Sequence, residues 1–201
     1  ELSRRGLAMV GAFVPAALKY EDRHAAGEAL AIKTARLMAA VANDGFKPFV
    51  VLADENGTDE VRTKNAGRIT ASMGLSDTEW RVFAAGAERI ARVVREETGL
   101  PTAFHHHCAG YVETPAEVGR LLDMTDPSLV GLVLDMGHLA YGAGGPDAVL
   151  QVMDAYADRI WHVHFKDCEP DVAQAARDDG WDYFEAVSQG VFCELGKGCV
   201  D

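Results

Sequence analysis

Short apolar segments alternate with longer amphipathic ones along most of the chain, and this alternation limits the fold more than any other feature. Each short segment is nearly continuous in apolar residues, which is typical of strands that are covered on both faces. The predicted strands are 7–14, 46–53, 102–107, 130–135 and 160–165. The predicted helices between them are 24–43, 77–98, 115–124 and 147–158.

Two of these helices have well-marked starts. Ser76 with Glu79, and Thr114 with Glu117, form capping boxes, and Pro115 occupies a first helical position. Strands that alternate with helices are joined by right-handed crossovers, and such connections build a parallel sheet. The sequence therefore predicts an α/β fold whose strands run parallel in sequential order.

The missing nucleotide-binding motifs favour a closed barrel over an open sheet. No G-x-G-x-x-G follows a predicted strand, and no G-x-x-x-x-G-K-[ST] occurs in the chain. A (β/α)8 TIM barrel typically needs about 250 residues. Five strands in 201 residues suit a barrel that lacks elements at both ends. No linker divides the chain, so we expect one domain over residues 1–201, incomplete at both ends.

The charge balance bears on which partners the chain can bind. There are 31 acidic residues against 19 Lys and Arg, a net charge of −12. Such a field repels phosphate backbones and anionic lipid, so we expect neither nucleic acid nor a membrane as partner. The four cysteines show no C-x-x-C spacing, and the first residues lack the apolar core of a signal peptide. A reducing, cytoplasmic location is the simplest prediction.

Histidines gather at the ends of the predicted strands. Six of the seven lie between positions 105 and 164. Five of these six end two strands, as His105-His106-His107 and as the pair His162 and His164. The remaining one follows the strand between them, in Asp135-Met-Gly-His138. In parallel α/β folds the ligand crevice lies at the carboxyl ends of the strands, so these are candidate site residues.

The residue types in these groups suit a metal. Because side chains alternate along a strand, His105 and His107 share one side, as do His162 and His164. Imidazole together with the Asp135 carboxylate suits Zn, Mn, Co or Fe better than Ca. The pattern predicts a mononuclear Asp/Glu/His site. The alternative is a set of hydrogen-bonded strand-end histidines without a metal.

Five further residues are candidate site residues, and each has two interpretations. Glu113 either precedes a helix cap or turns its carboxylate over the barrel mouth. Lys166 is either a solvated loop lysine or a cation that stabilises an enolate oxygen. Glu194 lies in a glycine-rich turn, on the surface or in a tight loop over the site. Asp54 and Glu55 are candidate partners of substrate hydroxyl groups, although exposed loop acids are the commoner case.

Three segments carry a resemblance to a known family. FHHHCAGYVETPAE (104–117), GLVLDMGH (131–138) and RIWHVHFKD (159–167) resemble the xylose-isomerase-like (β/α)8 barrels, the sugar phosphate isomerase/epimerase superfamily. Within it they are most similar to the inosose (2-keto-myo-inositol) dehydratase branch of inositol catabolism. FVVLAD (49–54) and ELGKGCVD (194–201) extend the likeness in the same order.

The resemblance implies one divalent metal, Mn, Co, Zn or Mg. Its family ligands are a carboxylate after the fifth strand, an Asp after the sixth, a His or Gln after the seventh and a Glu on the eighth. Asp135 and His164 match the sixth and seventh positions. The histidine run stands where the fifth-strand carboxylate is expected, so Glu113 or His105 is the alternative there. The eighth-strand Glu is expected after residue 201.

The implied chemistry is proton abstraction from carbon next to a carbonyl, by a lyase or by an isomerase or epimerase. His105, His107, His138 and His162 are the available acids and bases. No glycine-rich phosphate loop or Arg cluster occurs, so we expect an unphosphorylated sugar or cyclitol substrate. Self-association is left open. Two rival functions are a three-zinc phosphodiesterase like the AP endonucleases, which the acidic charge disfavours, and a polyol binder without catalysis.

Overall fold

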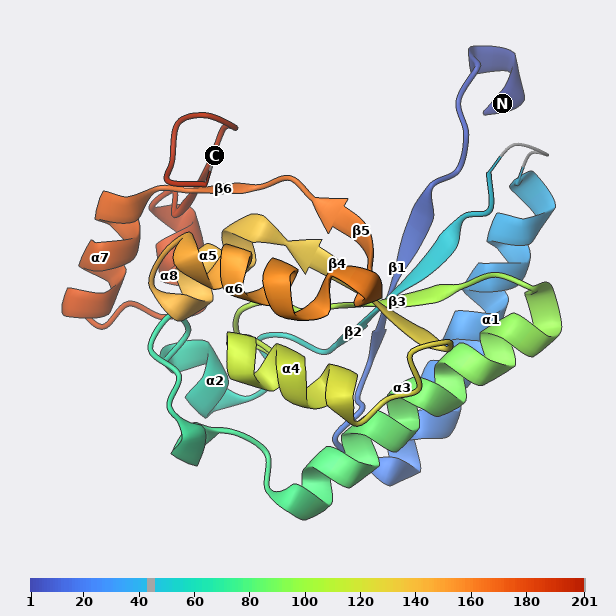
Figure 1. The fold of residues 1–201 in the computed structure, drawn as a ribbon, viewed down its shortest axis with the longest axis horizontal. Helices are drawn as coiled ribbons and strands as arrows, with labels where there is room; N and C mark the ends of the chain where they lie inside the picture. Colours follow the sequence, from blue (N-terminus) through green and yellow to red (C-terminus); the bar gives the residue numbers. More distant parts are fainter. Residues whose placement is uncertain (43–45, 201) are drawn as a thin grey trace.

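Five parallel strands form the main sheet of the computed structural model, which describes residues 1–42 and 46–200 (Figure 1). Neighbouring strands follow the order of the chain, and every adjacent pair is parallel. The predicted class and strand order are therefore confirmed. The strands are β1 (Gly11–Ala16), β2 (Phe49–Asp54), β3 (Thr102–His105), β4 (Val130–Asp135) and β5 (Ile160–His164).

Helices supply the crossovers between these strands, as the sequence predicts. The predicted ones are α1 (His24–Val41), α3 (Asp77–Thr98), α4 (Pro115–Asp123) and α6 (Asp147–Tyr156). Both expected capping boxes are formed, at the starts of α3 and α4. The expected end of the first helix, Asn43, lies outside the described residues. Within the described part of the chain, no helix has the length and apolar composition needed to cross a membrane.

Several strand boundaries differ from the prediction. The first strand begins at Gly11 rather than at residue 7, and Pro15, expected to end it, lies inside it opposite Ala53. An edge strand tolerates proline because its missing N–H leaves no ladder partner unpaired. The third and fifth strands end earlier than expected, so His106, His107 and Phe165 follow their strands.

The sequence does not predict several further elements, most of which are too short for a periodic pattern. The helices are α2 (Glu60–Lys64), α5 (Met136–Ala143), α7 (Pro170–Asp178) and α8 (Tyr183–Ser188). Two short strands, β6 (Asp167–Cys168) and β7 (Phe192–Cys193), pair antiparallel in a separate sheet. Single 3-10 turns occupy Ser3–Arg5, Glu21–Arg23, Ala71–Met73 and Ala157–Arg159. In Figure 1, β6, α7 and α8 lie at the opposite end of the molecule from α1.

The two faces of the main sheet bury different sets of side chains. One face packs Val14, Leu52, Phe104 and Leu132 into a large core against the helices. The opposite face holds a smaller cluster of Phe49, Val51, Ala103 and Val133, with Trp161 packed on it. Every residue of β2, β3 and β4 is buried, as continuous apolar segments predict.

The Trp161 indole is accommodated by a glycine on the neighbouring strand. The register between β4 and β5 shifts between Leu132 and Val133, which leaves Trp161 as an extra residue. A Cβ atom on Gly131 would overlap the indole ring. Position 131 therefore requires glycine because the Trp161 ring occupies the place of a Cβ atom, and not because of the backbone dihedral angles.

We predict that Gly131→Ala destabilises the fold by about 1–3 kcal/mol, because the added methyl group overpacks the contact with Trp161. Urea unfolding followed by circular dichroism measures the loss. Gly74→Ala is the matched control, since its Cβ would meet neighbours at an ordinary 3.4 and 3.5 Å. Equal stability of the two variants would contradict the packing argument.

Candidate metal centre

Three side chains with metal-ligand atoms converge at the carboxyl edge of the sheet. His105 ends β3, Asp135 ends β4 and His164 ends β5, and one ligand atom of each lies within 4.8 Å of the others. Asp135 pairs in register with His164, which places both at the same level. Asp135 and His105 are buried, whereas the side chain of His164 is 37% exposed. His164 is thus the most exposed member of the group.

The Asp135 carboxylate is the centre of this group. Its Oδ2 atom lies 3.3 Å from His105 Nε2, 3.4 Å from His164 Nδ1 and 3.2 Å from Lys166 Nζ. Its Oδ1 atom accepts the backbone N–H of His138, which caps α5. Burial opposes ionisation, but the hydrogen bonds from His105 and His164 and the nearby Lys166 charge outweigh it and lower the pKa of Asp135. Asp135 is therefore ionised at neutral pH.

The residues of the group fit a divalent metal. His105 Nε2 and His164 Nδ1 face the same oxygen of Asp135, at 3.3 and 3.4 Å, so two imidazole nitrogens and a carboxylate oxygen meet at one point. Burial also lowers the pKa of His105, which keeps the imidazole neutral, the form that binds metals. Two imidazoles and one carboxylate suit Zn, Mn or Co better than Ca, which prefers oxygen ligands throughout.

His138 lies beside this group with a defined tautomer. Its Nδ1 atom accepts the backbone N–H of Cys108 at 3.3 Å, so Nε2 carries the ring proton. The ring is buried, with its centroid 5.8 Å from that of His105. Burial holds the pKa of His138 well below its usual range. His138 is thus a neutral imidazole that can donate from Nε2.

His107 and Asp54, predicted to act on substrate, contact the loop that follows β3. His107 Nε2 lies 3.1 Å from the Asp54 carbonyl oxygen, and Nδ1 lies 3.3 Å from that of Cys108. Asp54 Oδ2 accepts the backbone N–H of Tyr111 at 2.6 Å. Both side chains are buried, and burial raises the pKa of Asp54. The structure therefore ties these residues to the connection between β3 and α4.

Glu113 lies outside the three-residue group. Its Oε1 and Oε2 atoms accept the backbone N–H groups of Gly67 and Ala109, at 2.7 and 2.9 Å. Ala109 has a φ of +64°, a left-handed conformation that this contact helps to hold. Burial raises the pKa of Glu113 to about 7. Of the two residues considered for the fifth-strand position, the structure brings His105 to the group and uses Glu113 to fix the loop.

The remaining predicted residues also lie outside the group. His162 sits on β5 below His164, with its ring centroid 5.5 Å from His164 and 4.7 Å from Phe49. Glu55 follows β2 and Glu194 follows β7, and both side chains are exposed.

Two buried charges near the site were missed by the sequence analysis. The Arg62 guanidinium is fully buried, donates to the Gly110 carbonyl oxygen at 2.7 Å and pairs with Glu117 at 2.8 and 3.0 Å. The sequence indicates Glu117 only as a capping residue, and α2 is too short for its pattern to single out Arg62.

Asp167 accepts the backbone N–H groups of Cys168, Gly196, Gly198 and Val200 at 2.8 to 3.0 Å. The Gly-Lys-Gly turn was the one signal for this contact.

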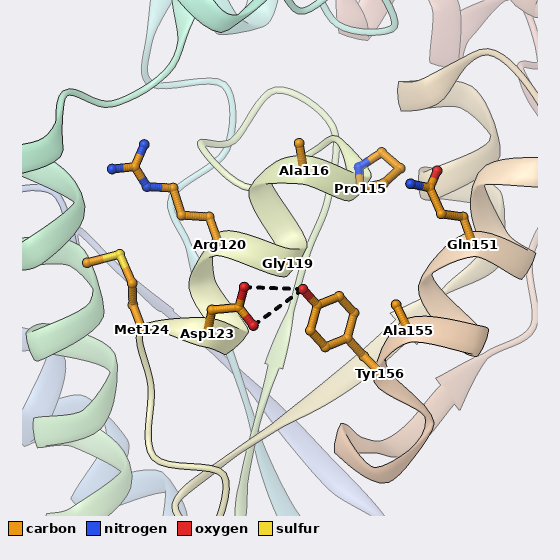
Figure 2. A pocket seen from close by; sticks show the side chains of 9 residues that line it. All are labelled: Pro115, Ala116, Gly119, Arg120, Asp123, Met124, Gln151, Ala155 and Tyr156. Carbon is orange, nitrogen blue, oxygen red and sulfur yellow. Dashed lines mark hydrogen bonds between the residues drawn. The ribbon is translucent and has the colours of Figure 1, made fainter.

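A separate cavity of about 470 Å³ lies between α4 and α6 (Figure 2). The Tyr156 hydroxyl reaches the Asp123 carboxylate at 3.4 Å within it. Its lining includes none of the residues predicted for the site.

Parallel strands in sequential order with a polar site at their carboxyl ends are the arrangement of βα-barrel proteins, and comparison with known proteins identifies the family. A model of the xylose isomerase-like TIM barrel family matches residues 66–201, so the chain belongs to that family. The inosose dehydratase of Geobacillus kaustophilus (strain HTA426) is 32% identical over 201 residues, 100% of this chain and 63% of that protein. The inosose dehydratase of Bacillus velezensis (strain DSM 23117 / BGSC 10A6 / LMG 26770 / FZB42) is 40% identical over 127 residues, 63% of this chain and 41% of that protein.

Solved structures show the same fold at lower identity. The IOLI protein, crystallised with a bound zinc atom, superposes with a TM-score of 0.62 at 15% identity over 97% of this chain and 60% of that protein. The chain thus spans less than two thirds of the length of these relatives.

We predict that Glu113 makes stability depend on pH. Its folded pKa, about 7, lies above that of an unfolded Glu, so its favourable contribution is present at acid pH and is lost as the pH rises towards and through 7. The free energy of unfolding of the wild type minus that of Glu113→Gln should therefore fall between pH 5 and 7, by at most about 1.4 kcal/mol per pH unit. Urea unfolding across this range measures it. A constant difference would show that Glu113 is ionised throughout.

Proposed function

We propose that this protein is a metal-dependent lyase of inositol catabolism that dehydrates an inosose. The observation that carries the proposal is the convergence of His105, Asp135 and His164 with the Lys166 ammonium at the carboxyl edge of the sheet. Catalytic residues of βα barrels lie at this edge. Relatives named inosose dehydratase, matching up to the whole chain, support the choice of reaction.

The three ligand residues would hold Mn, Co, Zn or Mg. A divalent cation bound by them supplies Lewis-acid polarisation of a substrate carbonyl. His105 and Asp135 are fixed by burial, whereas the half-exposed His164 faces the side from which substrate enters.

Three side chains around this centre supply the proton chemistry. His162, whose pKa burial and the neighbouring His164 lower, is neutral and accepts the proton from the carbon next to the carbonyl. Lys166 donates a hydrogen bond to the oxygen on which negative charge develops. The proton taken up by His162 passes to the β-hydroxyl group as its C–O bond breaks, and water leaves, while the neutral His138 donates an Nε2–H hydrogen bond to the departing oxygen. A hydrogen-bond donor placed at the leaving group favours dehydration over isomerisation, which needs no leaving group.

The substrate is an unphosphorylated cyclic polyol ketone. Within the described residues, Lys166 is the one Lys or Arg side chain that contacts Asp135. A phosphate group would call for several such donors or for a helix N-terminus with free N–H groups. The N-terminus of α5 is already capped by Asp135. Imidazole and ammonium donors match hydroxyl and carbonyl oxygens instead.

We predict that Asp135→Ala and His164→Ala each lower the metal content of protein dialysed against Mn or Co by at least about tenfold, because each removes one of few ligands. Metal analysis by mass spectrometry measures the content. Glu194→Ala is the control and should keep its metal, since this side chain is exposed and lies outside the group. Undiminished occupancy in both ligand variants would refute the site.

We predict that the protein, supplied with Mn or Co, converts 2-keto-myo-inositol to an enone-type product that absorbs in the ultraviolet. NMR in deuterated water follows both product formation and exchange at carbon. Deuterium exchange without loss of water would indicate an isomerase or epimerase. Turnover of a sugar phosphate with no reaction on any inosose would overturn the substrate assignment.

A further inference from the structure

The Lys166 ammonium lies between two partners. Its Nζ atom is 3.2 Å from Asp135 Oδ2 and 4.7 Å from the centroid of the Phe192 ring. The aliphatic stem passes over Gly137, where a Cβ atom would lie only 2.6 Å from Lys166 Cγ. The side chain is 32% exposed. Packing therefore directs this ammonium towards the ligand group and limits how far it can turn into solvent.

Phe192 is held in place from both sides. It pairs with Cys168 in the short sheet of β6 and β7, and its ring also packs on His138 at a centroid distance of 4.7 Å. Asp167, next to Lys166, anchors the following loop through the N–H groups of Gly196 and Gly198. The aromatic ring is thus a fixed platform for the ammonium.

The same carboxylate oxygen serves both the ammonium and the proposed metal. A divalent cation bound at Asp135 would have the Lys166 charge as a close neighbour in a half-buried site, where repulsion is stronger than in water. The electron-rich face of the Phe192 ring attracts the ammonium, and this contact uses none of the three candidate metal ligands. When a cation binds Asp135, the Lys166 ammonium can therefore leave that carboxylate and retain its contact with the Phe192 ring.

We propose that Lys166 is a built-in counter-cation of the metal centre. Its ammonium neutralises Asp135 when no metal is bound, weakens the affinity of the site for a divalent cation and remains on Phe192 when the cation binds. The proposal rests on the metal site of His105, Asp135 and His164, and it is independent of the substrate.

Titration of metal-free protein with Zn²⁺ alone, followed by calorimetry, tests this role. Lys166→Met should bind Zn²⁺ about tenfold more tightly or better, because it removes the competing charge and keeps the apolar stem. Lys166→Arg keeps the charge and should stay close to the wild type.

Phe192→Leu should have the opposite effect and weaken Zn²⁺ binding several-fold. Without the ring, the ammonium has no partner once Asp135 binds the metal. Phe184→Leu is the matched control, since Phe184 is 56% exposed on α8, outside the site, and it should leave binding unchanged.

The double variant Lys166→Met/Phe192→Leu separates this role from a general packing effect. If Phe192 acts through the ammonium, the double variant should bind Zn²⁺ as tightly as Lys166→Met. A Lys166→Met protein that binds no more tightly than the wild type would overturn the proposal, as would a Phe192 effect that persists without the lysine. Loss of Zn²⁺ binding from both the wild type and Lys166→Met would refute the metal site itself.

Discussion

The buried Asp135 carboxylate is the interaction on which the rest of the site depends. One oxygen caps α5 through the N–H of His138, and the other faces His105, His164 and Lys166. Burying a carboxylate is costly unless its charge is paired and its lone pairs accept hydrogen bonds. The same pairing that stabilises Asp135 brings side chains from three strands and a helix to one point. The candidate centre therefore depends on the alignment of β3, β4 and β5 at this edge of the sheet.

Buried charges behind this centre fix the loop between β3 and α4. Arg62 binds Glu117 and the Gly110 carbonyl, Glu113 binds Ala109, and Asp54 binds Tyr111. Each contact satisfies backbone or ionic groups that have no water to bond with. Such a network gives His105 a rigid support, which a site for chemistry on a small polar substrate requires.

The burial of each polar residue determines which groups it contacts. Buried carboxylates such as Glu113 and Asp54 accept backbone N–H groups, whereas the side chains of His164 and Lys166 are partly exposed. His138 lies between these sets, with one nitrogen fixed by Cys108 and the other available. The site thus combines a fixed interior with a few groups that can meet a substrate, and this combination supports the proposed dehydration.

The sequence by itself determined the parallel α/β fold, the order of the strands and the edge at which the histidines gather, because continuous apolar strands and capped helices are local patterns. It also indicated Asp135 and His164 through their strand-end positions. Only the tertiary structure shows that His105, and not Glu113, lies beside Asp135 and His164. The contacts of His107 and Asp54 with the loop after β3, of Arg62 with Glu117 and of Phe192 with His138 also appear only there. These depend on contacts between residues far apart in the chain, such as Arg62 with Glu117 and Glu113 with Gly67. Local sequence patterns record what a residue needs from its neighbours along the chain, but not which distant backbone N–H groups a buried charge will meet.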